Sequence, residues 1–365
     1  MSPKRKDIPG LSTTEECKQA RDKYPTLGHI GRAFGVSEHT VARRMAFFDV
    51  DYDHTRARTD TRERRWFSLP DPRTFESLTI ARERDEIRAN TWPQDKPARI
   101  GIISDTHEPE TCWPLLEYTL KRFGKLDGIV HAGDICRWEP VSPYHNATSE
   151  DWFEALDGGV RIFNRLAEAA PWLAVVRGNH DARLEKVLRR AMREHPKLAD
   201  WLVAQTDLMR YLKQESHGTI YAHRGWWLRF GNDLVVCHPD EFSGVPLRSA
   251  TNMRDWFEWR REKFVDPAVL VMGHTHRWSQ GRYHNCRVIE LGCMCWDSDW
   301  EQGPKLSSGK KDRWHRGAVA LTLLPDGSVD IPSIEVMDLT PVFDSYPGAR
   351  MEERWTKPPA KLLKE

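Results

Sequence analysis

The sequence predicts a mixed α/β fold preceded by a small all-α segment. Two observations support this prediction. The first fifty residues show helical periodicity, whereas the rest of the chain holds five short apolar runs, each ending in a polar motif, as buried strands do in α/β proteins. The five runs are residues 100–104, 127–131, 172–176, 234–236 and 268–272. We therefore expect the polar motifs to gather along one edge of a sheet.

Composition limits the class of protein. At 365 residues the chain can form one large core and a small additional domain. The formal net charge is +1, so no global field indicates a nucleic acid or a membrane as partner. No apolar stretch approaches the ~20 residues of a membrane span, and the start lacks the apolar segment of a signal peptide.

The cysteines indicate the compartment. There are seven, an odd number without a Cys-x-x-Cys pair, which fits a reducing compartment better than a disulfide framework. We expect a cytoplasmic protein with no membrane partner.

Five motifs, one after each apolar run, carry the chemistry. A single histidine at the end of a strand is usually structural, but this succession of motifs is very improbable by chance. The motifs are Asp105-Thr106-His107, Gly133-Asp134, Gly178-Asn179-His180-Asp181, Cys237-His238 and Gly273-His274-Thr275-His276.

The residue types indicate two divalent transition metal ions. Imidazoles and carboxylates suit Mn, Fe, Zn, Co or Ni, and four imidazoles argue against magnesium alone. Among these metals we expect Mn. Two ions about 3.5–4 Å apart need a ligand that touches both, and Asp134 can do so with its two oxygens. Such ions would activate a water for in-line attack on phosphorus, and His180 is the candidate acid for the leaving oxygen.

In this order the motifs resemble those of the calcineurin-like metallophosphoesterase superfamily, over about residues 98–335. The resemblance implies a four-layer α-β-β-α sandwich with two mixed sheets between helices. It also implies a role for each motif residue. The first metal would be held by Asp105, His107 and His276, the second by Asn179, His238 and His274, with Asp134 as the bridge and His180 as the acid.

One departure from the superfamily bears on the substrate. Phosphoprotein phosphatases read Gly-Asp-x-x-Asp-Arg-Gly at the second motif, where this chain has Arg137 in place of the second acid. That acid would orient the catalytic histidine, so a phosphoprotein phosphatase is disfavoured and Asp181 becomes the candidate orienting residue. Three arginines beside the motifs, Arg137, Arg177 and Arg183, are candidates for phosphate contact, because a guanidinium fork matches phosphate oxygens.

The first fifty residues predict a helix-turn-helix. Residues 14–34 hold helix-prone segments, Gly35 suits a left-handed turn, and a helix resumes over residues 38–47. Val41 and Met45 lie one turn apart and would form the inner face of that helix.

Residues 30–44 resemble the helix-turn-helix of bacterial regulators and of phage or transposon proteins. In such a unit, a DNA major groove or its phosphates would be contacted by His39, Thr40, Arg43 and Arg44. A three-helix module for protein contacts is the alternative.

The remaining segments complete the expected organisation. We expect a helix-turn-helix domain over residues 1–50, an arginine-rich linker and helix over 51–97, a metallophosphoesterase domain over 98–338 and a tail over 339–365. The arginines of the linker could contact phosphate groups, or the segment could be a solvent-exposed linker without a binding role. Residues 139–159, an insertion, and residues 184–211, helical and highly charged, are expected to rim the cleft.

The function we expect is hydrolysis of phosphodiester bonds, in nucleic acid, because a DNA-binding head would have little other use on a hydrolase. Two alternatives remain. One is a phosphomonoesterase acting on nucleotides or phosphoproteins, and the other is a DNA-binding regulator whose phosphoesterase fold is inactive.

Overall fold

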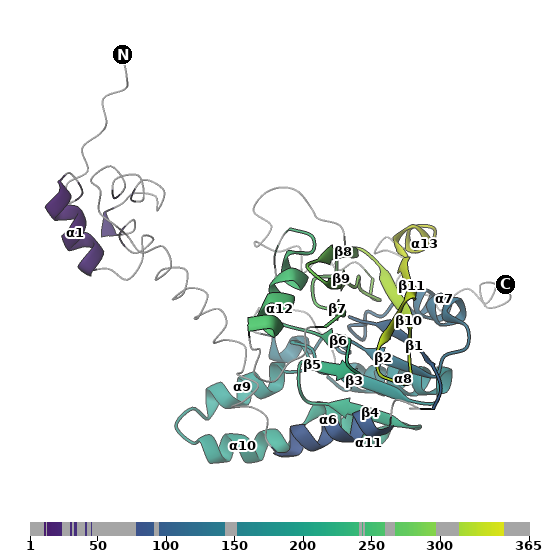
Figure 1. The fold of residues 1–365 in the computed structure, drawn as a ribbon. Coiled ribbons are helices and arrows are strands. Elements are labelled where there is room, and N and C mark those ends of the chain that lie inside the picture. Colours follow the sequence, from purple (N-terminus) through teal and green to yellow (C-terminus); the bar gives the residue numbers. More distant parts are fainter. Residues whose placement is uncertain are drawn as a thin grey trace. The chain divides into compact units, whose positions relative to one another are not determined.

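The computed structural model divides into two compact units, Met1–Phe75 and Glu76–Glu365 (Figure 1). The residues described are 11, 13–23, 30, 33, 34, 41, 45, 78–90, 95–142, 152–240, 243, 245–259, 267–296 and 314–346, with side chains of 82–88 in the first helix of the second unit. Each unit is described by itself.

The first unit contains the helix α1 (Thr14–Lys23), in the segment expected to be helical. A reciprocal capping box begins it, since Thr13 Oγ1 accepts from the Glu16 N–H at 3.2 Å and a Glu16 carboxylate oxygen accepts from the Thr13 N–H at 3.1 Å. Val41 and Met45 are buried, in agreement with the predicted inner face. The turn at Gly35 lies outside the described residues, so the helix-turn-helix stays a prediction.

The second unit contains two mixed sheets. One has the strand order β11-β10-β1-β2-β3-β4 and the other β5-β6-β7-β9-β8. The strands of the first sheet are β1 (Ala98–Ile103), β2 (Gly128–His131), β3 (Leu173–Val176), β4 (Ile220–His223), β10 (Gly317–Leu323) and β11 (Val329–Asp338). Those of the second are β5 (Trp227–Phe230), β6 (Leu234–Cys237), β7 (Val269–Met272), β8 (Ser279–Tyr283) and β9 (Cys286–Glu290).

The sheets pack against each other through alternating apolar side chains. Ala174 and Val176 of β3 belong to a core shared with β6 and β7, whereas Leu173 and Val175 of the same strand face a second core that contains helices. This period of two is what a strand buried on both faces requires. The predicted mixed α/β fold with two sheets is confirmed.

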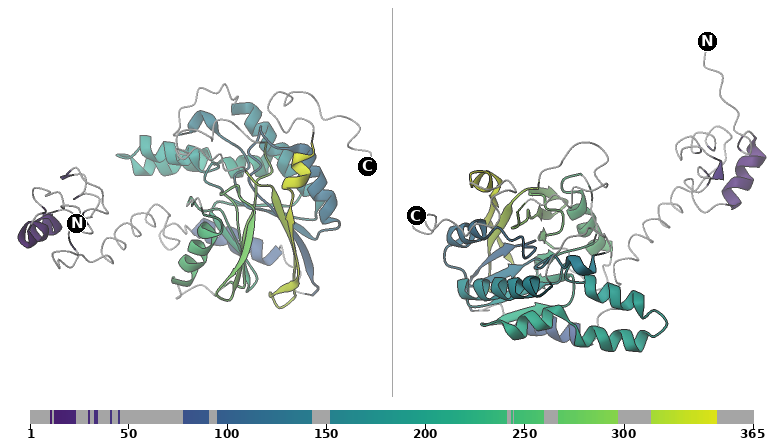
Figure 2. Two further views of the ribbon diagram at one scale, coloured as in Figure 1. Left: turned by 90° about the horizontal axis from the view of Figure 1, so that it is seen from above. Right: turned by 180° about the vertical axis from the view of Figure 1, so that it is seen from behind.

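Helices cover the outer faces of the sheets (Figures 1 and 2). On the first sheet, the second core includes side chains of α7 (Trp113–Phe123), α8 (Trp152–Ala169), α11 (Leu208–Glu215) and α13 (Thr340–Asp344). On the second sheet, α12 (Arg248–Trp259) contacts β7 and β9. The remaining helices are α6 (Leu78–Asn90), α9 (Arg183–Ala191), α10 (Pro196–Gln205) and the 3-10 turn η1 (Glu139–Val141).

The helix α6, within the segment expected to be a linker and a helix, covers the edge strands β4 and β5. Its Ile87 is buried in the core between the sheets, and Glu83 accepts from Arg224 Nε at 2.9 Å. It therefore packs with the sheets of the second unit.

The strand directions place the predicted motifs at one edge. Strands β1 to β4 are parallel to one another, and so are β6, β7 and β9. The five predicted apolar runs correspond to β1, β2, β3, β6 and β7, so all five motifs follow the carboxyl ends of parallel strands.

Two further features concern the cysteines and the helices. All seven cysteines are buried and free of disulfides. In the part of the chain that the structure describes, none of the helices has the length and apolar character needed to cross a bilayer.

Candidate metal centre

The five loops bring seven potential ligands into one buried cluster. Three groups of side chains each present ligand atoms within 4.8 Å of one another. The groups are Asp105, His107 and His276; His107, Asp134 and His180; and Asp134, His238 and His274. Because His107 and Asp134 belong to two groups each, the three groups form one continuous site.

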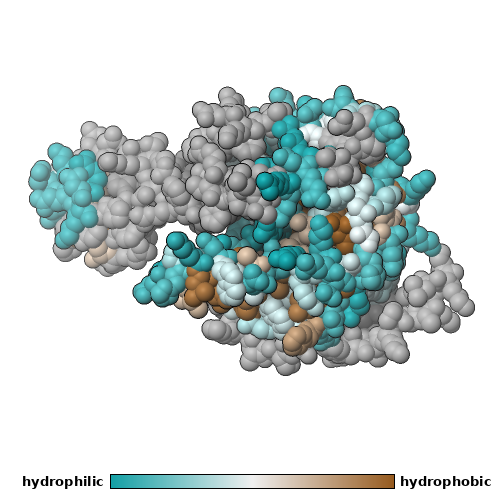
Figure 3. All heavy atoms as spheres, turned by 90° about the horizontal axis from the view of Figure 1, so that it is seen from below, coloured by the Kyte–Doolittle hydropathy of each residue, from teal (hydrophilic) through white to brown (hydrophobic). Residues whose placement is uncertain are grey.

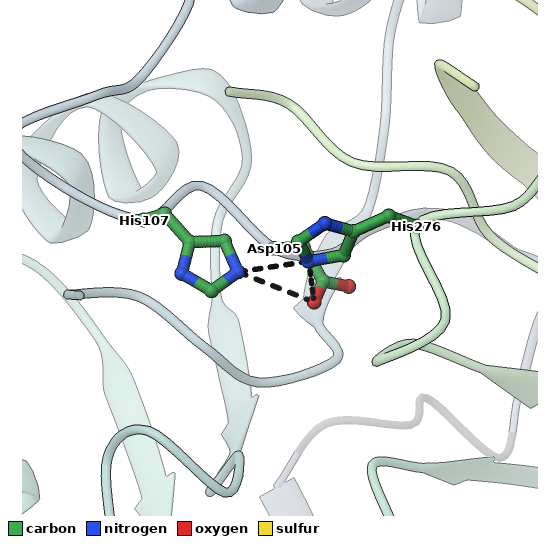
Figure 4. Close-up of side chains that lie close together, drawn as sticks. All are labelled: Asp105, His107 and His276. Carbon is green, nitrogen blue, oxygen red and sulfur yellow. Dashed lines mark hydrogen bonds and ion pairs between the residues drawn. The ribbon is translucent and has the colours of Figure 1, made fainter. Parts of the chain in front are cut away.

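The first group is shown in Figure 4. Nε2 of His107 and Nε2 of His276 point toward each other at 2.9 Å, and Asp105 Oδ1 lies 3.1 Å from His276 Nε2 and 3.6 Å from His107 Nε2. The other oxygen of Asp105 accepts from the His274 N–H at 3.0 Å, which fixes the direction of the carboxylate.

The ligands expected for the second metal are His238, His274 and Asn179, and the two imidazoles gather around the Asn179 side chain. Its Oδ1 lies 2.8 Å from His274 Nδ1 and 3.1 Å from His238 Nε2, and Asp134 Oδ2 lies 3.1 Å from the same His238 nitrogen. His238 Nδ1 donates to the Ala132 carbonyl oxygen at 2.6 Å. This bond leaves Nε2 as the nitrogen that faces the other ligands.

Asp134 lies between the ligands expected for the first metal and those expected for the second. Its Oδ2 is 3.8 Å from His107 Nε2 on one side and 3.1 Å from His238 Nε2 on the other. The second oxygen accepts from the His180 backbone N–H at 2.8 Å, so the carboxylate cannot rotate without losing that bond.

The spacing fits metal ions. Ligand atoms bound at about 2.1 Å to one ion lie roughly 3 Å apart, and the separations above are 2.8–3.6 Å within each group. An ion among these atoms would replace the hydrogen bonds that the ring nitrogens form with one another and with the facing oxygens. The residues present therefore fit two divalent ions.

The electrostatics agree. Burial alone would raise the pKa values of Asp105 and Asp134, but neighbouring imidazoles, above all that of His238, hold both well below the ordinary range. Although burial favours a neutral imidazole, Asp134 and Asp105 raise the pKa of His238 to about 9. The cluster thus stabilises positive charge at its centre.

The backbone is unusual at the same residues. Asp105, His107, Asp134, His274 and His276 have φ between 50° and 84°, in the left-handed region. A residue other than glycine costs about 1 kcal/mol or more there. Such strain at five ligands is typical of a functional site.

Gly178 allows the closest approach in this loop. A Cβ at Gly178 would lie 2.1 Å from Asp134 Oδ1 and 2.2 Å from the Asp134 nitrogen. Gly133 is in the left-handed region, and a Cβ there would lie 2.6 Å from His238 Nδ1. The glycines of the motifs therefore make room for the ligands.

Gly178→Ala should consequently displace Asp134. We expect the free energy of unfolding to fall by about 1–3 kcal/mol, with loss of bound metal and at least about tenfold lower turnover. Thermal unfolding, metal content and turnover measure this. Gly101→Ala is the matched control, because a Cβ there meets Leu126 and Phe123 at 2.8 and 2.9 Å, away from the ligands. It should destabilise without loss of metal, and a Gly178→Ala protein with normal metal content would contradict the argument.

His180 borders the cluster, with Nε2 3.9 Å from Asp134 Oδ2. Its Nδ1 lies 2.9 Å from the Arg137 carbonyl oxygen, and Arg183 Nη2 lies 2.9 Å from its Nε2. Since a guanidinium can only donate, Nε2 accepts and Nδ1 carries the proton. Burial lowers the pKa of His180 well below its ordinary value. The charge of Asp134 raises this pKa, whereas the charge of Arg183 lowers it further.

Asp181 is near His180 in sequence but contacts other groups. Its carboxylate accepts from the backbone N–H groups of Asp134 at 2.9 Å, Gly178 at 2.9 Å and Ile135 at 3.1 Å. Burial and the charge of Asp134 raise the pKa of Asp181 to about 6. These contacts hold the loop that carries Asp134, whereas the His180 ring is oriented through the Arg137 carbonyl and Arg183.

Two of the three candidate arginines lie at the site. Arg183 Nη1 donates to the Arg137 carbonyl oxygen at 2.6 Å, and Arg137 Nη1 donates to Glu110 at 2.6 Å. Arg177 instead forms an ion pair with Glu185 of α9.

Sequence reasoning missed the acids that accompany these arginines. Glu139 Oε1 lies 3.6 Å from Arg183 Nη1 and 3.8 Å from Arg137 Nε, and Glu139 is buried. It also missed Trp314, whose ring packs edge-on against that of His276 with centroids 4.4 Å apart. No motif or periodicity marks these residues, although Glu110 and Glu139 follow the first and second motifs closely in sequence, and Trp314 comes from a distant segment.

The DNA contacts expected of the helix-turn-helix fall outside the described residues. These are His39, Thr40, Arg43 and Arg44.

The chain belongs to the calcineurin-like phosphoesterase superfamily, whose domain model matches residues 99–305, more than half of the chain. Superfamily membership indicates a hydrolase of phosphoric esters, and its members typically bind divalent metals, in agreement with the ligand clusters. No curated protein matches the chain.

Among solved structures, the chain is similar to an archaeal phosphodiesterase, with 16% identity and a TM-score of 0.34 over 66% of this chain and 99% of that chain. It is also similar to a single mutant of Vps29 from Entamoeba histolytica, with 15% identity and a TM-score of 0.33 over 66% and 98%. A third is a predicted phosphoesterase from Streptococcus pneumoniae, with 14% identity and a TM-score of 0.29 over 66% and 98%. The family assignment depends on the matched domain and not on these structures.

Proposed function

We propose that this protein hydrolyses phosphodiester bonds in nucleic acid, with two divalent transition metal ions, Mn²⁺ first among them. The observation that carries the hydrolytic part is the single buried cluster in which Asp134 lies between two groups of ligands. The proposal extends the class of reaction that the superfamily indicates.

Each ligand has a proposed place. Asp105, His107 and His276 would hold the first ion, Asn179, His238 and His274 would hold the second, and Asp134 would bridge them. The short contacts within each group, such as 2.9 Å between His107 and His276 Nε2 and 2.8 Å between His274 and Asn179, support this division.

The chemistry divides between ions and side chains. Bound ions supply a nucleophile at neutral pH and neutralise charge on the phosphoryl oxygens. His180 protonates the leaving oxygen through Nε2, the nitrogen that faces Asp134. The Arg137 carbonyl and Arg183 keep the imidazole plane in place, and Asp181 fixes the loop that carries Asp134.

Arginines bind the substrate phosphate in this proposal. Arg183 has the clearest part, because phosphate oxygens accept stronger hydrogen bonds from a guanidinium than a neutral imidazole does. A bound phosphate would draw Arg183 from His180 Nε2 and leave that nitrogen able to carry a proton. Arg137 would contribute positive charge beside it, whereas Arg177 pairs with Glu185.

The nucleic-acid part depends on the N-terminal unit. Residues 1–50 would bind DNA as a helix-turn-helix and residues 98–338 would carry out catalysis, with residues 51–97 joining them. A DNA-binding domain would direct the hydrolase to phosphodiesters, because binding to DNA raises the local concentration of phosphodiester bonds at the catalytic site.

A substrate and metal panel tests the proposal. The protein is stripped with EDTA, reloaded with Mn²⁺, Fe²⁺, Zn²⁺, Co²⁺, Ni²⁺ or Mg²⁺, and assayed on bis-p-nitrophenyl phosphate, p-nitrophenyl phosphate, and single- and double-stranded DNA. We expect the diester and DNA to be cleaved, fastest with Mn²⁺. Preference for the monoester would establish a phosphomonoesterase instead, and no turnover with any metal would leave a DNA-binding regulator.

The helix-turn-helix is tested separately. Arg43→Ala with Arg44→Ala should weaken binding to duplex DNA and flatten its salt dependence, because fewer counterions are released. Turnover of bis-p-nitrophenyl phosphate should stay within about twofold of normal. DNA affinity at two salt concentrations and turnover are measured in parallel. Unchanged affinity would make this unit a protein-contact module and remove the main support for a DNA substrate.

A further inference from the structure

The helices α9 and α10 form an arm that extends from the metal centre. Figures 1 and 2 show α9 leading away from the sheets and α10 returning beside it. Among the residues of these two helices, all of which the structure describes, just Arg183 and Ala199 are buried. We call residues 183–205 the helical arm.

The helical arm exposes large apolar side chains instead of packing them in a core. Trp201 is 59% exposed, Leu198 45% and Val187 40%. Figure 3 shows brown apolar residues among hydrophilic ones on the face viewed from below, where α10 and α11 lie. Lys197 is one helical turn before Trp201, so an indole and an ammonium share one face of α10.

The helical arm is also basic. It contains six Lys and Arg residues and three Asp and Glu, a net +3, whereas the whole chain has a net +1 and the remainder therefore −2. Lys186 pairs with Asp240, and Arg189 pairs with Glu185 and Asp200. Across the described part of the chain, no ion pair includes Arg190, Arg193 or Lys197, and all three are exposed.

The helical arm begins beside the catalytic residues. Arg183, at the start of α9, lies 2.9 Å from His180 Nε2. Residues at positions 183, 187 and 190 of a helix share one face, so Val187 and Arg190 follow Arg183 along α9 away from the metal centre.

We propose that the helical arm binds a single strand of the nucleic-acid substrate, with Arg190, Arg193 and Lys197 on its phosphates and Trp201 stacked on a base. Cations that follow the backbone beside an exposed aromatic ring are the usual means of binding single strands. This inference rests on the proposed function. It favours nucleic acid over an anionic membrane because the helical arm begins at a site built for phosphoric esters.

Binding of a fluorescent 20-nucleotide oligo-dT, measured by anisotropy in EDTA with the full-length protein, tests the proposal. Trp201→Ala should weaken binding about 5- to 100-fold. Arg190→Gln, Arg193→Gln and Lys197→Gln together should reduce the slope of log affinity against log salt by about 2. With Mn²⁺ restored, both variants should raise the KM for the oligonucleotide and leave bis-p-nitrophenyl phosphate turnover unchanged.

Matched controls lie outside the helical arm. Lys121, Lys125 and Lys213 are exposed and precede the amino ends of β2 and β4, and Tyr211 is an exposed aromatic on α11. Changing the three lysines to Gln should leave the oligonucleotide affinity unchanged. Tyr211→Ala should also leave it unchanged.

The outcomes separate two failures. If the wild-type protein binds and cleaves the oligonucleotide and the arm variants do so equally well, the helical arm is not the binding surface but the proposed function stands. If the wild-type protein hydrolyses the small diester yet neither binds nor cleaves the oligonucleotide, the nucleic-acid substrate itself is wrong. Loss of binding to phosphatidylserine vesicles with unchanged oligonucleotide affinity would identify a membrane contact and overturn the proposal.

Discussion

Asp134→Asn should lower turnover by at least about 10³-fold and leave less than two metal ions per chain. The carboxylate lies between both ligand groups, 3.8 Å from His107 Nε2 and 3.1 Å from His238 Nε2, and an amide has no charge to hold two cations together. Metal content by elemental analysis and turnover of bis-p-nitrophenyl phosphate with Mn²⁺ measure the effect. The fold should survive, because an amide oxygen can still accept from the His180 N–H.

Asp127→Asn provides the matched control. Asp127 precedes β2, whereas Asp134 follows it, and the Asp127 carboxylate accepts from the Arg99 N–H at 2.9 Å at the opposite edge of the sheet. It should keep both ions and near-normal turnover. Two bound ions and normal turnover in Asp134→Asn would refute the assignment of Asp134 as the bridge.

His180→Ala should keep both metal ions and lower turnover by about 10²–10⁴-fold, the usual effect of losing a placed proton donor. The loss should be smaller for p-nitrophenyl esters than for esters of alkyl alcohols or nucleosides, because p-nitrophenolate leaves without a proton. Turnover of both kinds of ester and metal content are measured on the same preparation.

The comparison of leaving groups is the internal control. A merely structural role for His180 would reduce turnover of both esters by the same factor, since a displaced loop affects every substrate. Equal losses would therefore exclude His180 as the acid. A loss of metal would instead show that His180 supports the ligands, to which Nε2 comes within 3.9 Å at Asp134.

Local patterns were sufficient to predict the strands that position the ligands. The apolar run before Asp105 is β1, and the run before Asp134 is β2. Buried parallel strands are continuous in apolar residues and end where polar side chains begin. A chain with five such ends therefore predicts one edge with five clustered motifs, and the ligand atoms of each group do lie within 4.8 Å of one another.

The partners of the ligands could not be predicted in this way. Asp181 is next to His180 in sequence, yet it accepts from backbone N–H groups of a different loop. Arg177 adjoins the third motif but pairs with Glu185 of the following helix. Side-chain direction in a loop depends on backbone torsions that the residue order does not reveal.

The segment after η1 shows the same limit for secondary structure. Residues 139–159 read as an insertion, yet the helix α8 begins at Trp152 and contains Gly158 and Gly159, which disfavour a helix by themselves. A Cβ at these positions would lie 2.7 Å from Glu108 Oε2 and 2.7 Å from Cys136 Sγ. The glycines allow α8 to approach the loops of the first two motifs.

By itself, then, the sequence determined the strand ends and the types of ligand, because burial periodicity and metal preference are properties of short segments, and the order of its motifs implied the two-sheet fold through the resemblance to the superfamily. Tertiary structure alone decided that the Arg137 carbonyl meets His180, that Glu139 lies beside Arg183, and that Trp201 stays exposed. Those outcomes depend on which distant segments meet, and contact between segments is set by packing the whole core at once.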